Sequence, residues 1–290
     1  MEIVIETCLD SIKMLPFLFF AFLLIEFLEY YSGEMSGKLL KKVGKAGPVV
    51  GAVLGCVPQC GFSVLAANLY AGGVLSAGTL IAVFAATSDE AVLILMANPG
   101  RAGEIIWLLA VKVVIAVAAG YFVDGVMQKY IVRTEKNVHI KPRETVRPSK
   151  MEVVREAIGH TFRIFAYLFV FNLILNFAIE LLGIQKLSEI LLGNTVFQPI
   201  IAAIIGLIPN CAASVILTQL YLSGAISFAS VVSGLCTGAG VGLIVLFKMN
   251  SDKKENFRIL LTLVAIASVA GMFLQFLHFI TMCYNDSGPE

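Results

Sequence analysis

Long apolar runs separated by short basic segments dominate this chain of 290 residues. A run of about 20 apolar residues is long enough to cross the hydrocarbon core of a bilayer as an α-helix. Six runs meet this requirement, and the predicted crossing helices cover residues 12–31, 75–98, 104–127, 158–182, 226–247 and 257–282. The pattern therefore predicts an all-α integral membrane protein.

Two further apolar runs, residues 48–72 and 198–223, are each divided near the middle by a proline, Pro58 or Pro209. Proline inside a helix removes a hydrogen bond and breaks the helix. Each piece is then about ten residues long and, at about 1.5 Å per residue, spans only about half of the bilayer core. We therefore expect two re-entrant hairpins whose tips lie near the bilayer midplane, buried in protein or lining a wet cavity.

The second half of the chain repeats the first without a gap. Pro58 and Cys60 recur 151 residues later as Pro209 and Cys211. Further pairs in the same register are Gly55/Gly206, Ser63/Ser214, Tyr70/Tyr221, Glu104/Glu255 and Gly120/Gly271. The repeat divides the chain into a first repeat (1–128), a basic linker (129–156) and a second repeat (157–290), each repeat with three crossing helices and one hairpin.

The distribution of basic residues orients the two repeats. Lysines and arginines are concentrated in residues 32–47 and 129–156, which the positive-inside rule places in the cytoplasm. Three apolar runs lie between these segments, so one of them, 48–72, must return to the side it entered. The first repeat then crosses three times, so the second is inverted and both termini lie outside. Eight full crossings would put the basic linker outside, against the rule.

Composition excludes several classes of protein. Hydrophobic residues make up 58% and charged residues 14% of the chain, which is outside the range of soluble domains. A net charge of +1 gives no reason to expect a nucleic-acid partner. The six cysteines have no disulfide-framework spacing, and the N-terminus lacks the basic region and cleavage site of a signal peptide. No segment resembles an ATP-binding loop, and we expect no cofactor.

Two adjacent carboxylates, Asp89 and Glu90, lie in the middle of the predicted helix 75–98. A charge at the bilayer centre costs at least about 2.5–3.5 kcal/mol, so this pair needs a partner, a proton or a cation. Lys112 is a possible charge partner, and a coupling proton or cation is an alternative. The second repeat has glycines at this place, so both helices are expected to unwind and expose carbonyl groups. The candidate ion-binding residues here are Thr87, Ser88, Asp89 and Glu90.

Thiols, amides and hydroxyls gather at the two predicted hairpin tips. The candidate substrate-binding residues are Gln59, Cys60, Ser63 and Asn68 in the first repeat and Asn210, Cys211, Ser214 and Gln219 in the second. Cys60 and Cys211, with Asp89 and Glu90, form a candidate metal site that suits a thiophilic ion or trivalent arsenic. The half-helix N-termini that follow each tip are equally suited to an anion. Cys56 and Cys236 can be packing residues or ligands.

Four motifs carry a resemblance to a known family: Cys56-Val-Pro-Gln-Cys-Gly-Phe-Ser63, Ala86-Thr-Ser-Asp-Glu-Ala91, Gly206-Leu-Ile-Pro-Asn-Cys211 and Gly238-Ala-Gly-Val-Gly-Leu243. Over essentially its whole length the chain resembles a prokaryotic family of ten-segment heavy-metal exporters, whose members are labelled arsenic efflux protein or manganese transporter. Ten segments equal six crossings plus two hairpins counted twice. The resemblance implies a metal or metalloid substrate and a plasma-membrane location. Carboxylates and backbone oxygens suit manganese, whereas thiols suit arsenic.

Three function classes follow. The preferred one is a secondary transporter that exports a heavy metal or metalloid, such as arsenic or manganese. The second is a transporter of a small anion coupled to protons or cations through Asp89 and Glu90. The third is an intramembrane thiol oxidoreductase using Cys56 and Cys60, although three intervening residues is not the spacing of a redox pair. The expected partners are the bilayer and the transported ion, without nucleic acid, and a homodimer is compatible with the sequence.

Overall fold

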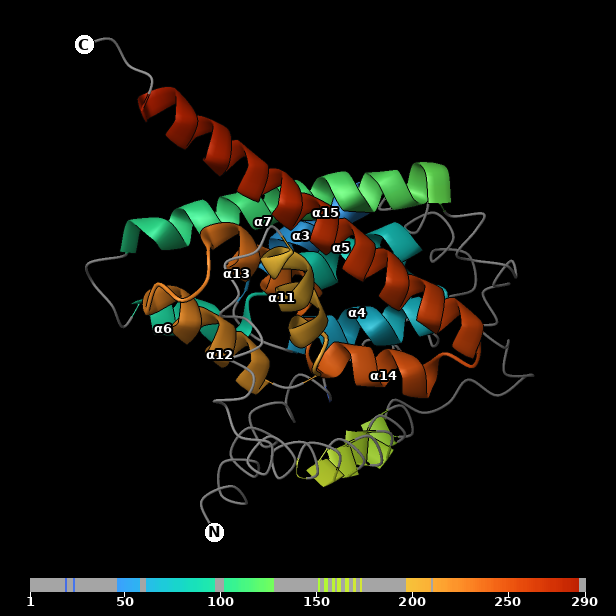
Figure 1. Cartoon of the computed structure of the whole chain (residues 1–290). Coiled ribbons are helices and arrows are strands. Elements are labelled where there is room, and N and C mark those ends of the chain that lie inside the picture. Colours follow the sequence, from blue (N-terminus) through green and yellow to red (C-terminus); the bar gives the residue numbers. More distant parts are fainter. Residues whose placement is uncertain are drawn as a thin grey trace.

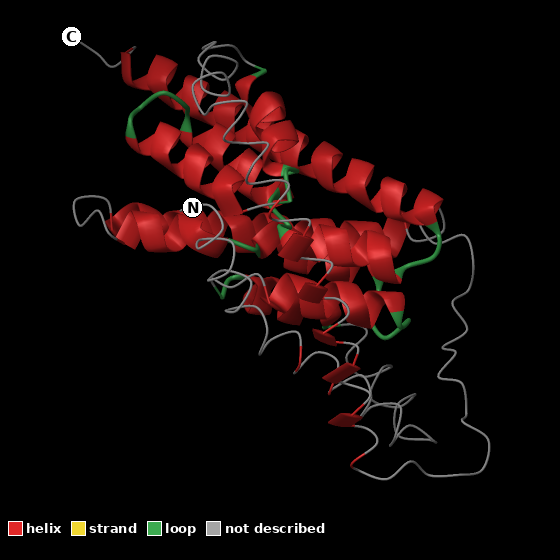
Figure 2. Cartoon of the chain, turned by 90° about the horizontal axis from the view of Figure 1, so that it is seen from below, coloured by secondary structure: helices red, strands yellow, loops and turns green. Residues whose placement is uncertain are grey.

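The computed structural model describes residues 46–57, 61–96, 102–127, 197–209 and 211–286, with single or paired positions in 19–23 and 151–173. Every regular element in these residues is a helix (Figures 1 and 2). The predicted helix 12–31, the tip residues 58–60 and 210, and most of the linker and of the predicted helix 158–182 lie outside the described residues.

The described part of the first half contains five α-helices and a π-helical turn. They are α3 (Gly47–Gly55), α4 (Gly61–Ala71), α5 (Ala77–Ala86), α6 (Asp89–Met96), α7 (Ala102–Phe122) and η2 (Val123–Met127). The second half contributes α11 (Gln198–Gly206), α12 (Cys211–Leu222), α13 (Phe228–Thr237), α14 (Val241–Met249) and α15 (Lys253–Asp286).

Two pairs of corresponding helices begin and end at corresponding residues. The bounds of α3 and α11, and those of α5 and α13, differ by 151 residues at both ends. The helix starts are also built alike, because the hydroxyl of Ser76 accepts a hydrogen bond from the N–H of Thr79, as that of Ser227 does from Ser230. These two serines satisfy otherwise unpaired amides at the first turn of each helix.

One helix of each half packs against a helix of the other half. Helix α3 packs against α5 and α7, and α11 packs against α13 and α15, so these contacts stay within one half. Helix α4, however, packs against α14 of the second half, and α12 packs against α6 of the first. Figure 1 shows α6 beside α12 at one end of the molecule and α4 beside α14 at the other.

As a result, each of the two apolar cores contains residues from both halves. One contains Leu80 and Phe84 of α5 together with Val245 of α14. The other contains Leu217 of α12 and Leu95 of α6. Burial of such side chains is the main favourable term in packing them, and neither half can complete its core alone.

Glycine allows the first arm of each hairpin run to approach its neighbour closely. A Cβ at Gly55 in α3 would lie 2.6 Å from the carbonyl oxygen of Val83 in α5. A Cβ at the corresponding Gly206 in α11 would lie 2.0 Å from the carbonyl oxygen of Gly234 in α13. Real Cβ atoms do not come this close to a carbonyl oxygen, so the helices can pack at this distance only through glycine.

Three described helical stretches are long and apolar enough to cross a membrane: Gly103–Val126, Phe228–Met249 and Lys253–Leu277. The first and third expose large apolar side chains, including Trp107 of α7 and Phe273 of α15. The second is almost wholly buried inside the protein. The outer faces of α7 and α15 are thus suited to lipid, while α13 and α14 are central.

Two of the predicted crossing helices are not continuous. The predicted helix 75–98 is divided into α5 and α6 at Thr87 and Ser88, and the predicted helix 226–247 into α13 and α14 at residues 238–240. Gly240 has a φ of 52°, a left-handed value that favours glycine. The last helix is longer than the predicted 257–282, because α15 extends from Lys253 to Asp286.

Candidate functional site

One buried lysine joins the two broken helices. Lys112 of α7 is completely buried, and its ammonium Nζ donates hydrogen bonds to the carbonyl oxygens of Thr87, at the end of α5, and Leu235, in the last turn of α13. The distance from Nζ to the Leu235 oxygen is 3.0 Å. The breaks in the two halves therefore meet around a single positive charge.

The breaks themselves make these carbonyls available. In a continuous helix the Leu235 carbonyl would accept from the N–H of Ala239, but that N–H donates to Thr237 instead, at 2.7 Å. The N–H of Ala91 likewise donates to Ser88, at 3.1 Å, and not to Thr87. Lys112 supplies the donor that each interrupted helix has lost.

The two hydroxyls at the first break are used locally. Thr87 donates its hydroxyl to the carbonyl of Val83 at 2.8 Å, and Ser88 donates to that of Ala86 at 3.0 Å. Both residues are buried. Thr87 is one of the predicted ion-binding residues, and its main-chain oxygen contacts the cationic ammonium group of Lys112.

Asp89 and Glu90 are the first two residues of α6, directly after the break. The N-terminus of a helix carries partial positive charge and stabilises carboxylates beside it. The placement of their side chains lies outside what the structure describes, so the predicted ion pair with Lys112 stays a prediction. Cys60, Gln59 and Asn210 also fall outside the described residues, and Cys211 is described only as the first residue of α12.

Serines in the first turns of α4 and α12 lie close to the second break. A Cβ on Gly242 of α14 would be 2.7 Å from the Cβ of Ser63, and one on Gly238 would be 3.6 Å from Oγ of Ser214. Both serines are buried. The structure therefore brings the predicted residues Ser63 and Ser214 near the interrupted part of the second half.

The predicted amides Asn68 and Gln219 have different surroundings. Asn68 of α4 is 2% exposed, and neither its side-chain nitrogen nor its oxygen has a hydrogen-bond partner within the described part of the chain. Gln219 of α12 is exposed. An unpaired buried amide carries a desolvation penalty, so Asn68 is the more suitable of the two for a bound ligand.

Two thiols lie near the same lysine. Cys56 follows α3 and is partly buried, Cys236 of α13 is buried, and both are close enough to Lys112 for an electrostatic interaction. Each also packs against one of the apolar cores. Within the described residues no group of three or more His, Cys, Asp or Glu side chains could hold a metal ion.

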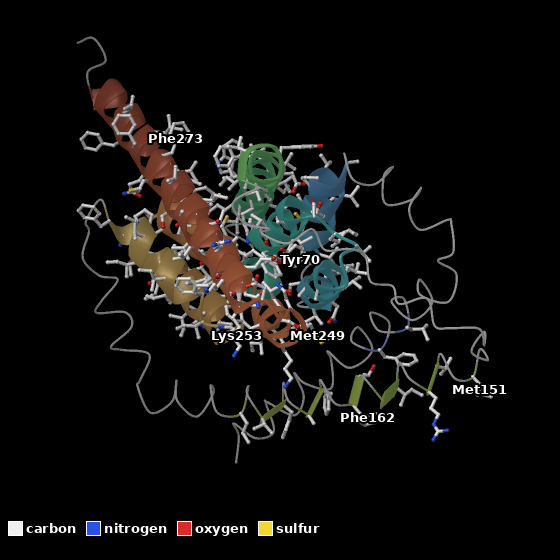
Figure 3. All side chains as sticks on the ribbon, turned by 90° about the vertical axis from the view of Figure 1, so that its right-hand side faces the viewer. Tyr70, Met151, Phe162, Met249, Lys253 and Phe273 are labelled. Atoms are coloured by element: carbon white, nitrogen blue, oxygen red, sulfur yellow. The ribbon has the colours of Figure 1, made fainter. Side chains whose placement is uncertain are left out.

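Two tyrosine–glutamate hydrogen bonds connect the halves reciprocally. Tyr70 of α4 donates to Glu255 of α15 at 2.5 Å, and Tyr221 of α12 donates to Glu104 of α7 at 2.7 Å. In Figure 3, Tyr70 lies near Met249 and Lys253, which flank the turn into α15. Sequence reasoning did not predict these contacts, although both tyrosines and both glutamates occupy matching positions in the repeat.

The turn before α15 holds the first of these pairs in place. Asn250 donates its side-chain amide to Glu255 at 3.2 Å, and the carboxylate of Asp252 accepts from the N–H groups of Glu255 and Lys254. Hydrogen bonds from these N–H groups, that of Glu255 first, hold the pKa of Asp252 below its usual range. Asp252 is therefore an anionic N-cap of α15.

Comparison with known families identifies the chain. The sequence model of the family described as "Putative, 10TM heavy-metal exporter" matches residues 1–183 and 166–287. The chain belongs to this family. No curated protein and no solved structure matches it.

Membership in the 10TM heavy-metal exporter family agrees with the helical architecture and the apolar outer faces of α7 and α15. The chain is thus a multi-pass membrane protein, and its family is one of metal transporters. The family description also indicates a transport protein in preference to an enzyme. The interrupted helices around Lys112 hold buried polar groups, among them Thr87, Ser88 and Lys112 itself.

Proposed function

We propose that the protein is a secondary transporter that exports a heavy metal or metalloid ion, arsenic or a divalent metal such as manganese. One observation carries the proposal: two interrupted helices, α5–α6 and α13–α14, come together inside the protein, where buried Lys112 contacts a main-chain carbonyl of each. Non-helical backbone inside a membrane is tolerated only where it is buried in protein or lines a cavity. Discontinuous helices of this kind form the substrate sites of many secondary transporters.

The two halves act as inverted repeats, with hairpins α3–α4 and α11–α12 that enter from opposite sides. Two observations support this arrangement. Helices α3 and α11, and helices α5 and α13, have matching bounds at an offset of 151 residues, and α4 and α12 each pack against a helix of the other half. The basic linker 129–156 lies in the cytoplasm, and both termini lie outside the plasma membrane of a prokaryotic cell.

The transported ion binds near the two breaks. Asp89 and Glu90 supply negative charge at the start of α6, and Asn68, Ser63 and Ser214 supply neutral polar groups around it. The burial of Asn68 without a hydrogen-bond partner in the described residues supports a role in binding. The hairpin-tip residues complete the site, with Gln59 and Asn210 serving a hard cation and Cys60 and Cys211 a thiophilic one.

A second candidate is a transporter of a small anion. The observation that favours it is the position of Lys112, a buried positive charge at the break that directly precedes α6. Half-helix N-termini and a lysine together attract anions. The carboxylates Asp89 and Glu90 would then carry the coupling proton or cation.

Flux into proteoliposomes tests the proposal. The purified full chain is reconstituted and exposed to arsenite, Mn²⁺ or Zn²⁺ on one side, with protein-free vesicles and a D89N/E90Q variant as controls. The proposal expects saturable flux of at least one of these ions that both controls lack. Flux of phosphate or another oxyanion, with none of the three ions carried, would support the anion transporter instead.

Four single variants then separate thiophilic from hard substrates. For arsenic or a soft metal, Cys60→Ser and Cys211→Ser remove the dominant ligands, and flux falls while Gln59→Ala and Asn210→Ala matter less. For manganese the amide variants are the damaging ones and the serine variants keep their flux. A Cys60/Cys211 double serine variant with unchanged flux of every ion would remove the thiols from the site.

A further inference from the structure

Two helix ends converge on one point in the protein interior. The carbonyls of Thr87 and Leu235 lie at the C-terminal ends of α5 and α13, and both accept from Nζ of Lys112. The C-terminal end of a helix carries a partial negative charge of about half an electron, and two such ends placed together attract a cation. Interrupted helices elsewhere use this arrangement to coordinate alkali cations.

The breaks leave these oxygens without their usual donors. The N–H groups that would serve them in continuous helices donate to Thr237 and Ser88 instead. A carbonyl buried without a donor is costly, so this place requires a donor or a cation in every functional state. The chain meets the requirement with its own ammonium group, which is completely buried.

The lysine belongs to one half of the chain only. The residue 151 positions after Lys112 is Leu263 of α15, which is 1% exposed and packs in an apolar core. Core packing of the outer helix therefore does not demand a charge at this position. A buried apolar side chain fills the corresponding space in the second half, so the positive charge of Lys112 serves a purpose other than filling space.

We propose that the Thr87 and Leu235 carbonyls form a cation-binding site that the protein occupies with the tethered ammonium of Lys112. A small cation with oxygen ligands, such as Na⁺, K⁺ or a primary ammonium ion, takes this place when the lysine is shortened. In the native protein Lys112 substitutes for such an ion. Transport by the native chain is consequently independent of Na⁺ and K⁺ at this site.

Thermal unfolding of purified variants tests the site directly. Lys112→Ala is compared with wild type in choline, sodium, potassium and methylammonium chloride of equal ionic strength. Choline is too large for the site and serves as the reference salt. We expect wild type to unfold at the same temperature in all four salts. K112A unfolds lower in choline and recovers most of that loss in at least one of the other three, because a ligand that binds only the folded state stabilises it.

Leu263→Ala is the matched control. It removes a buried apolar side chain at the corresponding position of α15, where the native protein has no ammonium group for a cation to replace, and its unfolding temperature is expected to fall equally in all four salts. A K112A variant that responds to Na⁺, K⁺ and methylammonium no more than L263A does would overturn the proposal. A wild type that itself gains stability from Na⁺ or K⁺ would do the same.

A flux measurement on wild type keeps the inference testable if K112A does not fold. This arm rests on the proposed transport function, whereas the unfolding comparison does not. Replacement of all Na⁺ and K⁺ by choline is expected to leave flux of Mn²⁺, Zn²⁺ or arsenite unchanged. Flux that falls severalfold on replacement, together with a wild type that unfolds at a higher temperature in Na⁺ or K⁺ than in choline, would contradict the tethered substitute. A wild type that carries none of the three ions would overturn the proposed function, and the unfolding comparison then decides the cation site.

Discussion

Tyr70 donates a hydrogen bond of 2.5 Å to the carboxylate of Glu255, 185 residues further along the chain. The bond joins α4 of the first half to α15 of the second. Its counterpart joins Tyr221 of α12 to Glu104 of α7. The reciprocal bonds stand at matching positions of the two halves, so each half contributes one donor and one acceptor to the contact between them.

Loss of the Tyr70 hydroxyl is expected to destabilise the protein more than loss of its counterpart. Glu255 is 1% exposed, whereas Glu104 is partly exposed and keeps access to solvent. A hydrogen bond to a charged group contributes about 1.5–3 kcal/mol, and the cost is largest where the acceptor stays buried. Tyr70→Phe should therefore lower the free energy of unfolding by about that amount, and Tyr221→Phe by less. Denaturant unfolding of the two purified variants checks the order, and equal losses would contradict it.

Gly242 is expected to tolerate no side chain. A Cβ there would lie 2.7 Å from the Cβ of Ser63 and 2.8 Å from its backbone. Overpacking of this kind costs about 1–3 kcal/mol, so Gly242→Ala should destabilise the contact between α4 and α14. Gly103→Ala in α7 is the control, since among the described residues no atom outside the adjoining part of its own helix lies within 4 Å of the added carbon. Unfolding temperatures of both variants test the difference, and an unchanged G242A would show that the packing of α4 on α14 does not require glycine at this position.

Replacement of Asn68 by leucine is expected to stabilise the protein and to impair transport. Its buried amide has no partner in the described residues, so Asn68→Leu removes an unsatisfied group and should raise the free energy of unfolding by about 1–3 kcal/mol. If the amide binds the transported ion, the same variant loses flux. Gln219→Leu, at the exposed counterpart, should change stability by no more than about 0.5 kcal/mol. A destabilised N68L would mean that the amide has a structural role.

The adjacent carboxylates are expected to be essential for transport. Two bare negative charges at the membrane centre would be too costly, so we expect Asp89 and Glu90 to share a proton or to hold a cation. Asp89→Asn and Glu90→Gln keep the shape of the side chains and remove the charge. Both variants should insert normally and lose flux in proteoliposomes. Wild-type flux with unchanged pH dependence in both would assign the pair a structural role.

The linker of residues 129–156 is expected to be cytoplasmic. Its lysines and arginines would otherwise violate the positive-inside rule. Single cysteines introduced into a cysteine-free variant should react with a membrane-impermeant maleimide only after the cells are opened. Labelling of the linker in intact cells would overturn the inverted arrangement and the midplane site together.

The sequence by itself determined where the two hairpin runs are interrupted. Pro58 and Pro209 predicted the interruptions that separate α3 from α4 and α11 from α12, because proline cannot continue a helix. The constant offset of 151 residues predicted the matching bounds of α3 and α11 and of α5 and α13. Length and apolarity predicted a membrane protein, and the motifs around the two prolines predicted its family. All of these depend on local backbone chemistry or on composition, which a sequence contains in full.

The contacts between the halves were decided only by the tertiary structure. Tyr70 and Glu255 are 185 residues apart, and nothing local to either residue states that α4 packs on α14 in the other half. Likewise the sequence suggested Lys112 as a partner for carboxylates, and the structure shows its ammonium bound to two main-chain oxygens. Main-chain carbonyls are identical at every residue, so a sequence cannot show which of them a helix break leaves without a donor. Only the packing of α7 across both breaks determines that Thr87 and Leu235 are the ones.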